Sequence, residues 1–176
     1  IYLHIDKKSG DFSPDMVRTQ HSRLILVDRM GVYWGGHSQI LCELNLLKAA
    51  LPGKYRYYHL ISGVDLPLKT QDEIHAFFRD NDGKEFLEFH EAACQDHGLF
   101  DFRCCYYHPL QNFAGSSRKL THRLLRKGDW AIMNLQKWLG LKRPEIVPLY
   151  KGANWFSITH ALAAYVVSRE KLIRKQ

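Results

Sequence analysis

Three side chains with the chemistry to hold a substrate follow one another closely: Ser62, Asp65 and Lys69. They come directly after residues 57–61, an aromatic and aliphatic run that is typical of a buried strand. Ligands of open α/β sheets sit beyond the carboxyl ends of the strands, so this pattern predicts a binding loop. The alternative is a tight strand-to-helix turn, in which Asp65 caps the next helix turn and Lys69 is simply solvated.

Two other loops, residues 6–9 and 33–38, also follow strand-like runs and carry residues suited to a ligand. A nucleotide-sugar pocket needs an acid or a backbone group for the base and ribose, and an aromatic ring for stacking. It also needs glycines, which permit close backbone approach, and Lys or Arg to neutralise the diphosphate. These residue types occur in the three loops, which together predict such a pocket.

The elements that must position these loops alternate along the chain. Thr70 and Glu73 predict a capping box at one helix start, and Thr159 predicts the cap of a final helix. The remaining patterns predict strands at 1–5, 24–27, 57–61, 85–89, 102–107 and 155–158, a helical turn at Ser13-Pro14, and helices around Leu41 to Leu51 and over 116–139. This alternation predicts an α/β sandwich with a largely parallel sheet.

Length and composition favour one folded domain. The chain has 176 residues, of which 45% are apolar and 12% aromatic, so a real core is expected. No apolar run approaches the ~20 residues of a membrane span, and no signal peptide is visible. Because the sequence opens inside a strand-like run and closes in a charged helical stretch, we expect it to be part of a longer protein. No Ser or Cys lies in a nucleophile elbow, which disfavours hydrolase chemistry.

The formal net charge of +7 is concentrated in one stretch. Between residues 116 and 143 a single acid, Asp129, faces eight basic residues: Arg118, Lys119, Arg123, Arg126, Lys127, Lys137, Lys142 and Arg143. Leucines and two tryptophans lie among them, so the stretch predicts a surface for anionic lipid or for a phosphorylated ligand. The alternative is a helix packed through its leucines with an ordinary solvated face. Nucleic acid is not expected, because no binding motif accompanies the charge.

Four cysteines make a poor disulfide framework for a chain of this length, so a reducing compartment is expected. One segment gathers potential zinc ligands: His90, Cys94, His97, Cys104, Cys105 and His108. Their spacing lacks the paired Cys-x-x-Cys ends of a zinc ribbon or finger. Buried thiols with surface histidines are therefore preferred to a structural zinc site.

Four segments occur in an order and spacing that match a known family: residues 1–9, 33–36, 60–70 and 151–159. With them the chain resembles the core-2/I-branching β-1,6-N-acetylglucosaminyltransferases and the related peptide O-xylosyltransferases. The resemblance extends from Ile1 to about Arg169. We expect a bacterial member, which would be cytoplasmic and peripheral at the inner membrane; a eukaryotic member would lie in the Golgi lumen.

The resemblance implies a GT-A-like α/β fold, with a Rossmann-type, largely parallel sheet flanked by helices. One glycosyltransferase domain, truncated at both ends, would fill residues 1–176, with a nucleotide-binding half at about 1–80 and an acceptor half at about 81–176. The implied activity is inverting, metal-independent transfer of N-acetylglucosamine, or of xylose, from a UDP donor to a hydroxyl of a glycan, lipid-linked or protein acceptor. N-acetylglucosamine is favoured, and no cofactor is expected. The alternative from another class is a non-catalytic domain that binds carbohydrate or nucleotide.

The family's motifs also suggest which residues bind the donor. Asp6 would serve the uridine side, while Trp34, Gly35 and Gly36 would line the donor pocket. Asp65, on the family's Gly-x-Asp motif, would lie at the centre of the pocket.

On the acceptor side, the resemblance places Trp155 beside the acceptor sugar, with packing in the core as the alternative. Glu88 alternates with apolar residues in a predicted strand and is a candidate for an acceptor hydroxyl or for a cross-strand charge pair. Lys69 and Lys151 are further candidates. The family's catalytic glutamate and its diphosphate-binding basic residues would lie beyond Gln176, so no catalytic residue is assigned, and no metal ligand.

Overall fold

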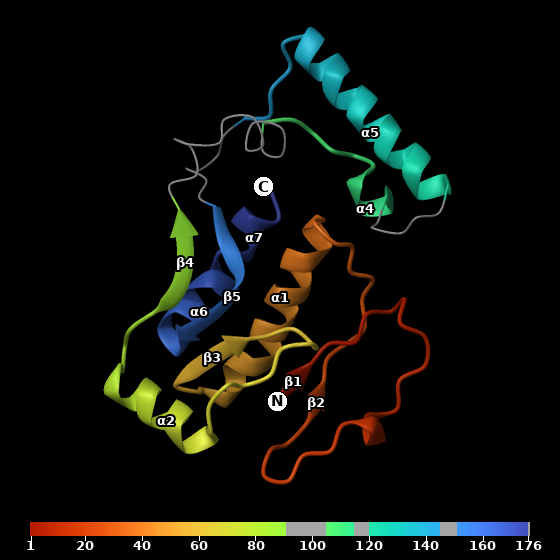
Figure 1. The fold of residues 1–176 in the computed structure, drawn as a ribbon. Coiled ribbons are helices and arrows are strands. Elements are labelled where there is room, and N and C mark those ends of the chain that lie inside the picture. Colours follow the sequence, from red (N-terminus) through yellow and green to blue (C-terminus); the bar gives the residue numbers. More distant parts are fainter. Residues whose placement is uncertain (91–104, 115–119, 145–150, 176) are drawn as a thin grey trace. The chain divides into compact units, whose positions relative to one another are not determined.

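The computed structural model describes residues 1–90, 105–114, 120–144 and 151–175 (Figure 1). The chain divides into two compact units, each made of two separate stretches of sequence. Residues 1–46 and 91–150 belong to the first unit, and residues 47–90 and 151–176 to the second. The expected division into contiguous nucleotide and acceptor halves stays a prediction.

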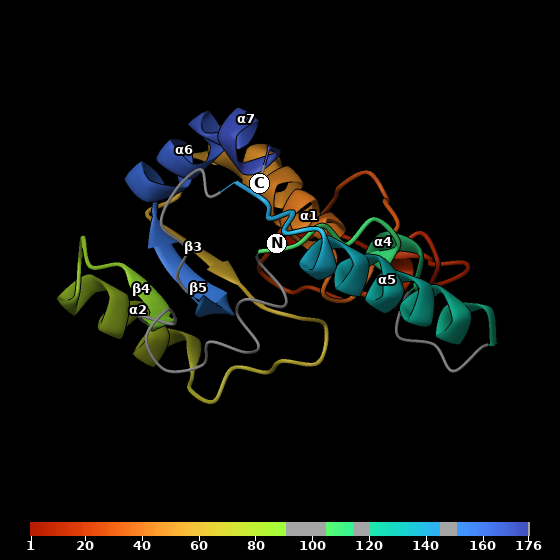
Figure 2. The same cartoon turned by 90° about the horizontal axis from the view of Figure 1, so that it is seen from above.

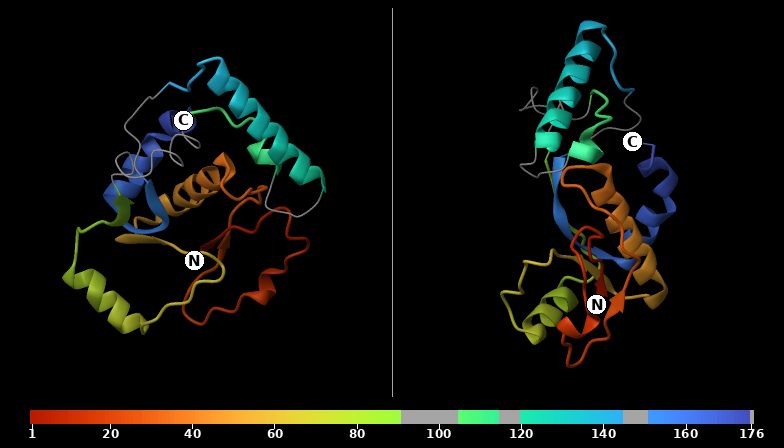
Figure 3. Two further views of the ribbon diagram at one scale, coloured as in Figure 1. Left: turned by 45° about the horizontal axis from the view of Figure 1, so that its top comes forward. Right: turned by 90° about the vertical axis from the view of Figure 1, so that its right-hand side faces the viewer.

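The first unit contains a short parallel pair of strands, β1 (Tyr2–Leu3) and β2 (Ile25–Leu26). Between them lies the 3-10 turn η1 (Pro14–Met16), which Ser13 precedes and Pro14 opens, as the sequence predicts. After the glycine-containing turn at 33–36, helix α1 (His37–Ala50) begins. In the later part of this unit, α4 (Gln111–Ala114) packs against the long helix α5 (Leu120–Trp138) (Figure 3).

The second unit is built on a three-stranded antiparallel sheet in the order β3–β5–β4. Its strands are β3 (Tyr57–Leu60), β4 (Phe86–His90) and β5 (Lys151–Thr159), with a register shift in β4 between Leu87 and Phe89. Four helical segments accompany the sheet: η2 (Leu51–Gly53), α2 (Gln71–Asp80), α6 (His160–Ser168) and α7 (Glu170–Ile173).

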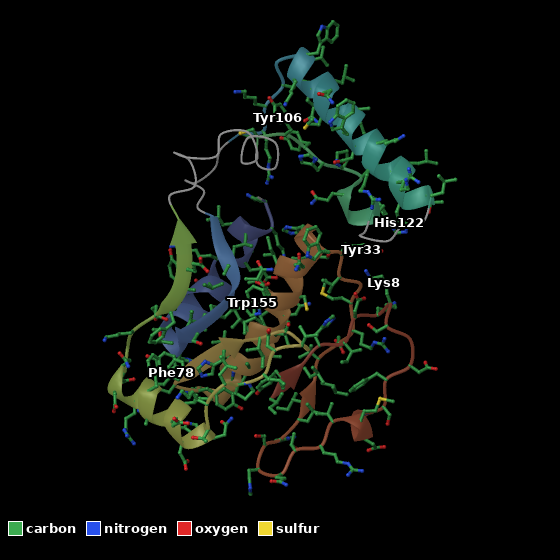
Figure 4. All side chains as sticks on the ribbon, viewed as in Figure 1. Lys8, Tyr33, Phe78, Tyr106, His122 and Trp155 are labelled. Carbon is green, nitrogen blue, oxygen red and sulfur yellow. The ribbon has the colours of Figure 1, made fainter. Side chains whose placement is uncertain are left out.

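Successive residues of β3 point to opposite faces of this sheet, as a strand requires. The Tyr58 hydroxyl is 2.8 Å from Nδ1 of His160 in α6. On the other face, Tyr57 and His59 contact Phe78 of α2, with ring centroids 4.7 and 4.5 Å apart. Figure 2 accordingly shows α6 and α2 on opposite sides of the strands, and Figure 4 labels Phe78 on α2.

The predicted helix starts are confirmed. The Thr70 hydroxyl accepts a hydrogen bond from the Glu73 amide, and the Glu73 carboxylate accepts one from the Thr70 amide, which completes the capping box. The Thr159 hydroxyl caps α6 by accepting from the Leu162 amide. The helical leucine spacing around residue 44 is that of α1, where Leu44 and Leu47 are buried.

Two predictions about strands need correction. The mixture of helices and strands is confirmed, but only β1 and β2 pair in parallel among the described strands, because β5 runs antiparallel to both of its neighbours. The alternation of strands and helices along the sequence does not determine whether β5 runs parallel or antiparallel to the strands beside it. The strand expected at 102–107 is wrong for residues 105–107, which form bends and coil, whereas 102–104 lie outside the described residues. Within the described ranges, every helix is too short or too polar to cross a membrane.

Candidate functional site

Asp65 and Trp155, ninety positions apart in sequence, are joined by a direct hydrogen bond in the second unit. The Trp155 indole donates from Nε1 to Oδ2 of Asp65 over 2.8 Å. The backbone amide of Ser62 donates to the same oxygen, and the Asp65 amide donates to the Ser62 carbonyl over 3.1 Å. The loop after β3 is therefore closed on itself, and its carboxylate is aimed at β5.

These contacts exclude two of the structural alternatives. Asp65 binds back to Ser62 instead of capping the next helix, because Thr70 supplies that cap. Trp155, labelled in Figure 4, is not a core residue, because it is 54% exposed. Hydrogen bonds from Ser62, and then from Trp155, lower the pKa of Asp65. Asp65 is consequently a carboxylate at neutral pH, presented at the surface beside an exposed indole ring.

The loop that carries Asp65 is unusually apolar for an exposed segment. Val64, Leu66 and Leu68 are all largely exposed. Lys69 at its end forms an ion pair with Glu73, with 3.4 Å between Nζ and Oε1. Because both side chains are open to solvent, Lys69 matches the solvated lysine of the alternative interpretation.

The remaining candidates of this unit lie on β4 and β5. Glu88 lies where β4 shifts register and its residue is exposed. Glu85, just before β4, makes a carboxylate contact to the end of β5, where it accepts hydrogen bonds from the amide and the hydroxyl of Thr159. Lys151 pairs with His90 in the strand register, but its side chain lies outside the described part of the chain.

In the first unit, Asp6 organises its own loop. Its carboxylate accepts hydrogen bonds from the amides of Lys8 at 2.9 Å and Val32 at 3.4 Å. Burial works against ionisation, but these hydrogen bonds lower the pKa of Asp6. The Lys8 ammonium donates to the Val32 carbonyl and lies 4.1 Å from the centroid of the Tyr33 ring (Figure 4). Arg29 completes the loop by donating to the carbonyls of Asp6 and Gly10.

The turn at 33–36 is held by three side chains, two from the start of α1 and one from α4. Ser38 accepts from the Tyr33 amide, and Gln39 accepts from the Gly35 amide over 2.7 Å. Gln111, from α4, donates to the Gly35 carbonyl over 2.5 Å. Gly35 has a φ of +69°, a conformation that favours glycine. The clamped turn leaves the Trp34 side chain 75% exposed, as a stacking platform requires.

Gln39 and Gln111 are the residues of this region that sequence reasoning missed. The spacing of Gln39, four residues after Gly35, was available as a signal. No local pattern points to Gln111, because it lies 76 residues away in sequence. The predicted donor residues are divided between the units: Asp6 and the turn Trp34–Gly36 belong to the first, and Asp65 to the second.

One motif with a bearing on metal binding was also missed. Asp80-Asn81-Asp82 is an Asp-x-Asp triplet, the pattern that holds a metal in many nucleotide-sugar enzymes. The Asp82 carboxylate is held by Arg56, with contacts of 2.6 Å to Nε and 2.5 Å to Nη2. Asn81 accepts from Lys84 and donates to the Phe77 carbonyl. The triplet thus builds the turn after α2. Among the described residues, no group of three or more His, Cys, Asp or Glu could hold a metal ion, while Cys94, His97 and Cys104 lie outside them.

Comparison with known proteins agrees with the resemblance seen in the sequence. Rat xylosyltransferase 2 is 27% identical to the chain over 175 residues, and human xylosyltransferase 2 is 24% identical over 172. These alignments cover 96% and 94% of this chain but 18% of each relative, so the chain spans less than a fifth of their length. No solved structure matches the chain. The family model described as core-2/I-branching enzyme matches residues 1–176, and the chain therefore belongs to the core-2/I-branching enzyme family.

Proposed function

We propose that this chain forms part of a glycosyltransferase that moves a sugar from a UDP donor to an acceptor hydroxyl. The observation that carries the proposal is the hydrogen bond between Trp155 and Asp65, which presents an indole face and a carboxylate together at the surface. Family membership and the similarity to xylosyltransferase 2 support transfer chemistry at such a site.

The Asp65–Trp155 pair has the two features that sugar recognition uses. The exposed indole offers a large, rigid apolar face with one polar edge, which suits the C–H face of a pyranose. A carboxylate can accept about four hydrogen bonds. The pKa of Asp65 is lowered by hydrogen bonds from the Ser62 backbone, the Ser62 side chain and Trp155. The carboxylate can still accept a further hydrogen bond, from a sugar hydroxyl.

We propose that the transfer is a single inverting displacement. The acceptor oxygen would attack the anomeric carbon in line with the departing UDP, while a general base takes the hydroxyl proton. The bond from the anomeric carbon to the diphosphate oxygen breaks as the new glycosidic bond forms. We assign neither the base nor the diphosphate-binding groups to residues of this chain.

The donor sugar is N-acetylglucosamine or xylose. The resemblance of the four motifs favours the first, and the names of the relatives favour the second. Metal independence is part of the proposal, and Arg56 supports it because its guanidinium already occupies the Asp82 carboxylate of the Asp-x-Asp triplet.

The test is to incubate the full-length parent protein with UDP-N-acetylglucosamine or UDP-xylose and a panel of glycan and peptide acceptors, with and without EDTA. Products are identified by mass spectrometry, and the anomeric configuration by NMR. Turnover with inversion that survives EDTA is expected. Retention of configuration would refute the displacement mechanism. Loss of activity in EDTA would refute metal independence. So would a loss of activity in Asp82→Asn as large as the loss in Asp65→Asn.

The second candidate is a domain that binds carbohydrate without transferring it. The same exposed pair favours it, because an indole beside a carboxylate is sufficient to bind a sugar. Calorimetry separates the candidates: saturable binding of UDP is expected for a transferase. Binding of free sugars that depends on Trp155, without UDP binding or turnover, would establish the second candidate.

A further inference from the structure

Helix α5 presents three different faces along its nineteen residues. At 3.6 residues per turn, positions separated by four, seven or eleven residues share a face. The burial of each position can therefore be compared directly with its place around the helix.

One face packs into the first unit. Asp129, Met133 and Gln136 are buried, and they lie at i, i+4 and i+7. The Gln136 side chain donates to the Tyr107 carbonyl and accepts from the Tyr107 amide, both over 2.9 Å. These buried contacts define which side of α5 faces the rest of its unit.

The side turned away from these contacts is an exposed apolar stripe. It consists of Leu120, Leu124, Ala131, Leu135 and Trp138, at i, i+4, i+11, i+15 and i+18, and Lys127 occupies the i+7 position within it. Trp138, at its carboxyl end, is 81% exposed. Within the described part of the unit, the leucines and Trp138 of this stripe stay more than half exposed, so a helix packed through its leucines with an ordinary solvated face does not account for them.

A basic strip borders this stripe. Arg123, Arg126 and Lys137 lie on adjoining positions, with Trp130 between them and 61% exposed. Arg123, Arg126, Lys127 and Trp130 line a shallow hollow of about 260 Å³. The single acid of α5, Asp129, lies on the buried face, so the exposed charges of the helix are all positive.

We propose that α5 lies flat on an anionic membrane. The apolar stripe would enter the boundary between headgroups and acyl chains, and the basic strip would contact the lipid phosphates. Nineteen residues give a helix of about 28 Å, which is long enough to hold several headgroups along one side. Trp130 and Trp138 have the amphipathic rings that settle at this depth. Charge alone would suit any polyanion; the exposed leucines and tryptophan on both sides of Lys127 select a lipid surface.

The experiment uses the full-length protein and vesicles of phosphatidylcholine, with or without about a third of phosphatidylglycerol. Flotation should recover the protein with the anionic vesicles at low salt and not with the neutral ones. Salt at about 1 M, where the Debye length is about 3 Å, should release it. Absence of binding to anionic vesicles at low salt overturns the proposal.

Three variants locate the contact. Arg123→Glu/Arg126→Glu/Lys127→Glu should weaken vesicle binding by about a hundredfold, at the usual contribution of a basic residue near an anionic surface. Leu124→Ser/Leu135→Ser should weaken it while leaving every charge in place. The matched control, Lys54→Glu/Lys84→Glu/Lys171→Glu, makes the same charge change on the second unit and should bind nearly as wild type. Circular dichroism confirms that each variant is folded.

Two other outcomes would replace the membrane by another occupant. A general polyanion site would give two results together. Leu124→Ser/Leu135→Ser would bind vesicles as wild type does, and Arg123→Glu/Arg126→Glu/Lys127→Glu would lose binding to heparin as strongly as it loses binding to vesicles. If the leucine variant turns a dimer into a monomer without changing vesicle binding, the stripe is covered by a second copy of the chain. Either result contradicts the proposal.

Discussion

The carboxylate of Asp129, in the middle of α5, is hydrogen-bonded to the ring of His108, with 2.7 Å between Oδ2 and Nδ1. Its other oxygen accepts the Leu110 amide over 3.0 Å. Asp129 is only 9% exposed, so this residue ties the start of α4 to the buried side of α5. Without these bonds, two donors in the segment before α4 would lose their acceptor.

Asp129→Ala should therefore destabilise the first unit. A buried acceptor removed from two donors costs on the order of 1–3 kcal/mol, and more where a charge is left unpaired. Chemical denaturation of the full-length protein measures the change, with the exposed Asp28→Ala as control. Equal stability of the two variants would show that the hydrogen bonds contribute little.

Asp65→Asn should lower turnover by at least about tenfold while the melting temperature stays nearly unchanged, because the carboxylate lies at the surface. Trp155→Phe keeps an aromatic face but loses the indole donor, so it should reduce activity less than Trp155→Ala. Steady-state kinetics on the parent protein measure all three, with Asp11→Asn as a surface control. A parallel loss of stability and activity in Asp65→Asn would assign the residue to folding.

Gln111→Ala should loosen the turn that presents Trp34. One hydrogen bond to the Gly35 carbonyl is lost, at a cost of about 1 kcal/mol. Hydrogen exchange at the amides of Gly35 and Gly36 should accelerate about fivefold, with Gln20→Ala as control. If this turn binds the donor, the KM for the UDP-sugar rises while kcat changes less. Unchanged exchange would mean that Ser38 and Gln39 hold the turn on their own.

Thr70→Ala should cost about 1 kcal/mol, because the capping box loses the hydroxyl that satisfies the Glu73 amide. Thr70→Ser keeps the hydroxyl and should restore most of the stability. Thr121→Ala, at an exposed position in α5, should be neutral or slightly stabilising since alanine favours helix. Denaturation midpoints measure the series, and a Ser variant no better than Ala would exclude the capping explanation.

Glu43 in α1 gives a pH dependence with a defined sign. Burial raises the pKa of its carboxyl to about 7, whereas the unfolded chain releases this proton near 4.3. Between these pH values the folded protein binds more protons than the unfolded chain. The contribution of Glu43 to the free energy of unfolding is therefore complete below about pH 4.3 and declines as pH rises toward 7. Glu43→Gln should therefore raise the melting temperature above pH 7 and leave it unchanged at about pH 4. An equal shift at both pH values would contradict this linkage.

Most predictions that depended on neighbouring residues were confirmed, apart from the strand expected at 105–107, whereas those that depended on distant residues were not. The capping box of Thr70 and the leucine spacing of α1 each involve residues only a few positions apart, so the local sequence is sufficient to predict them. The direction of β5 depends on the path of the chain between residues 91 and 150, which no local pattern encodes. Asp65 and Trp155 were both identified as candidates, but their mutual hydrogen bond was not, because it joins residues ninety positions apart.

The central position of β5 also determines when the second unit can fold. In the described part of the chain, β3 and β4 each pair only with β5. During synthesis β4 leaves the ribosome about sixty residues before its partner and β3 about ninety, which is roughly 3–18 s at the usual elongation rates. Throughout that interval their backbone edges are open to pairing with other chains. Efficient folding of residues 47–90 therefore depends on uninterrupted translation through Thr159, or on a chaperone that covers the two waiting strands.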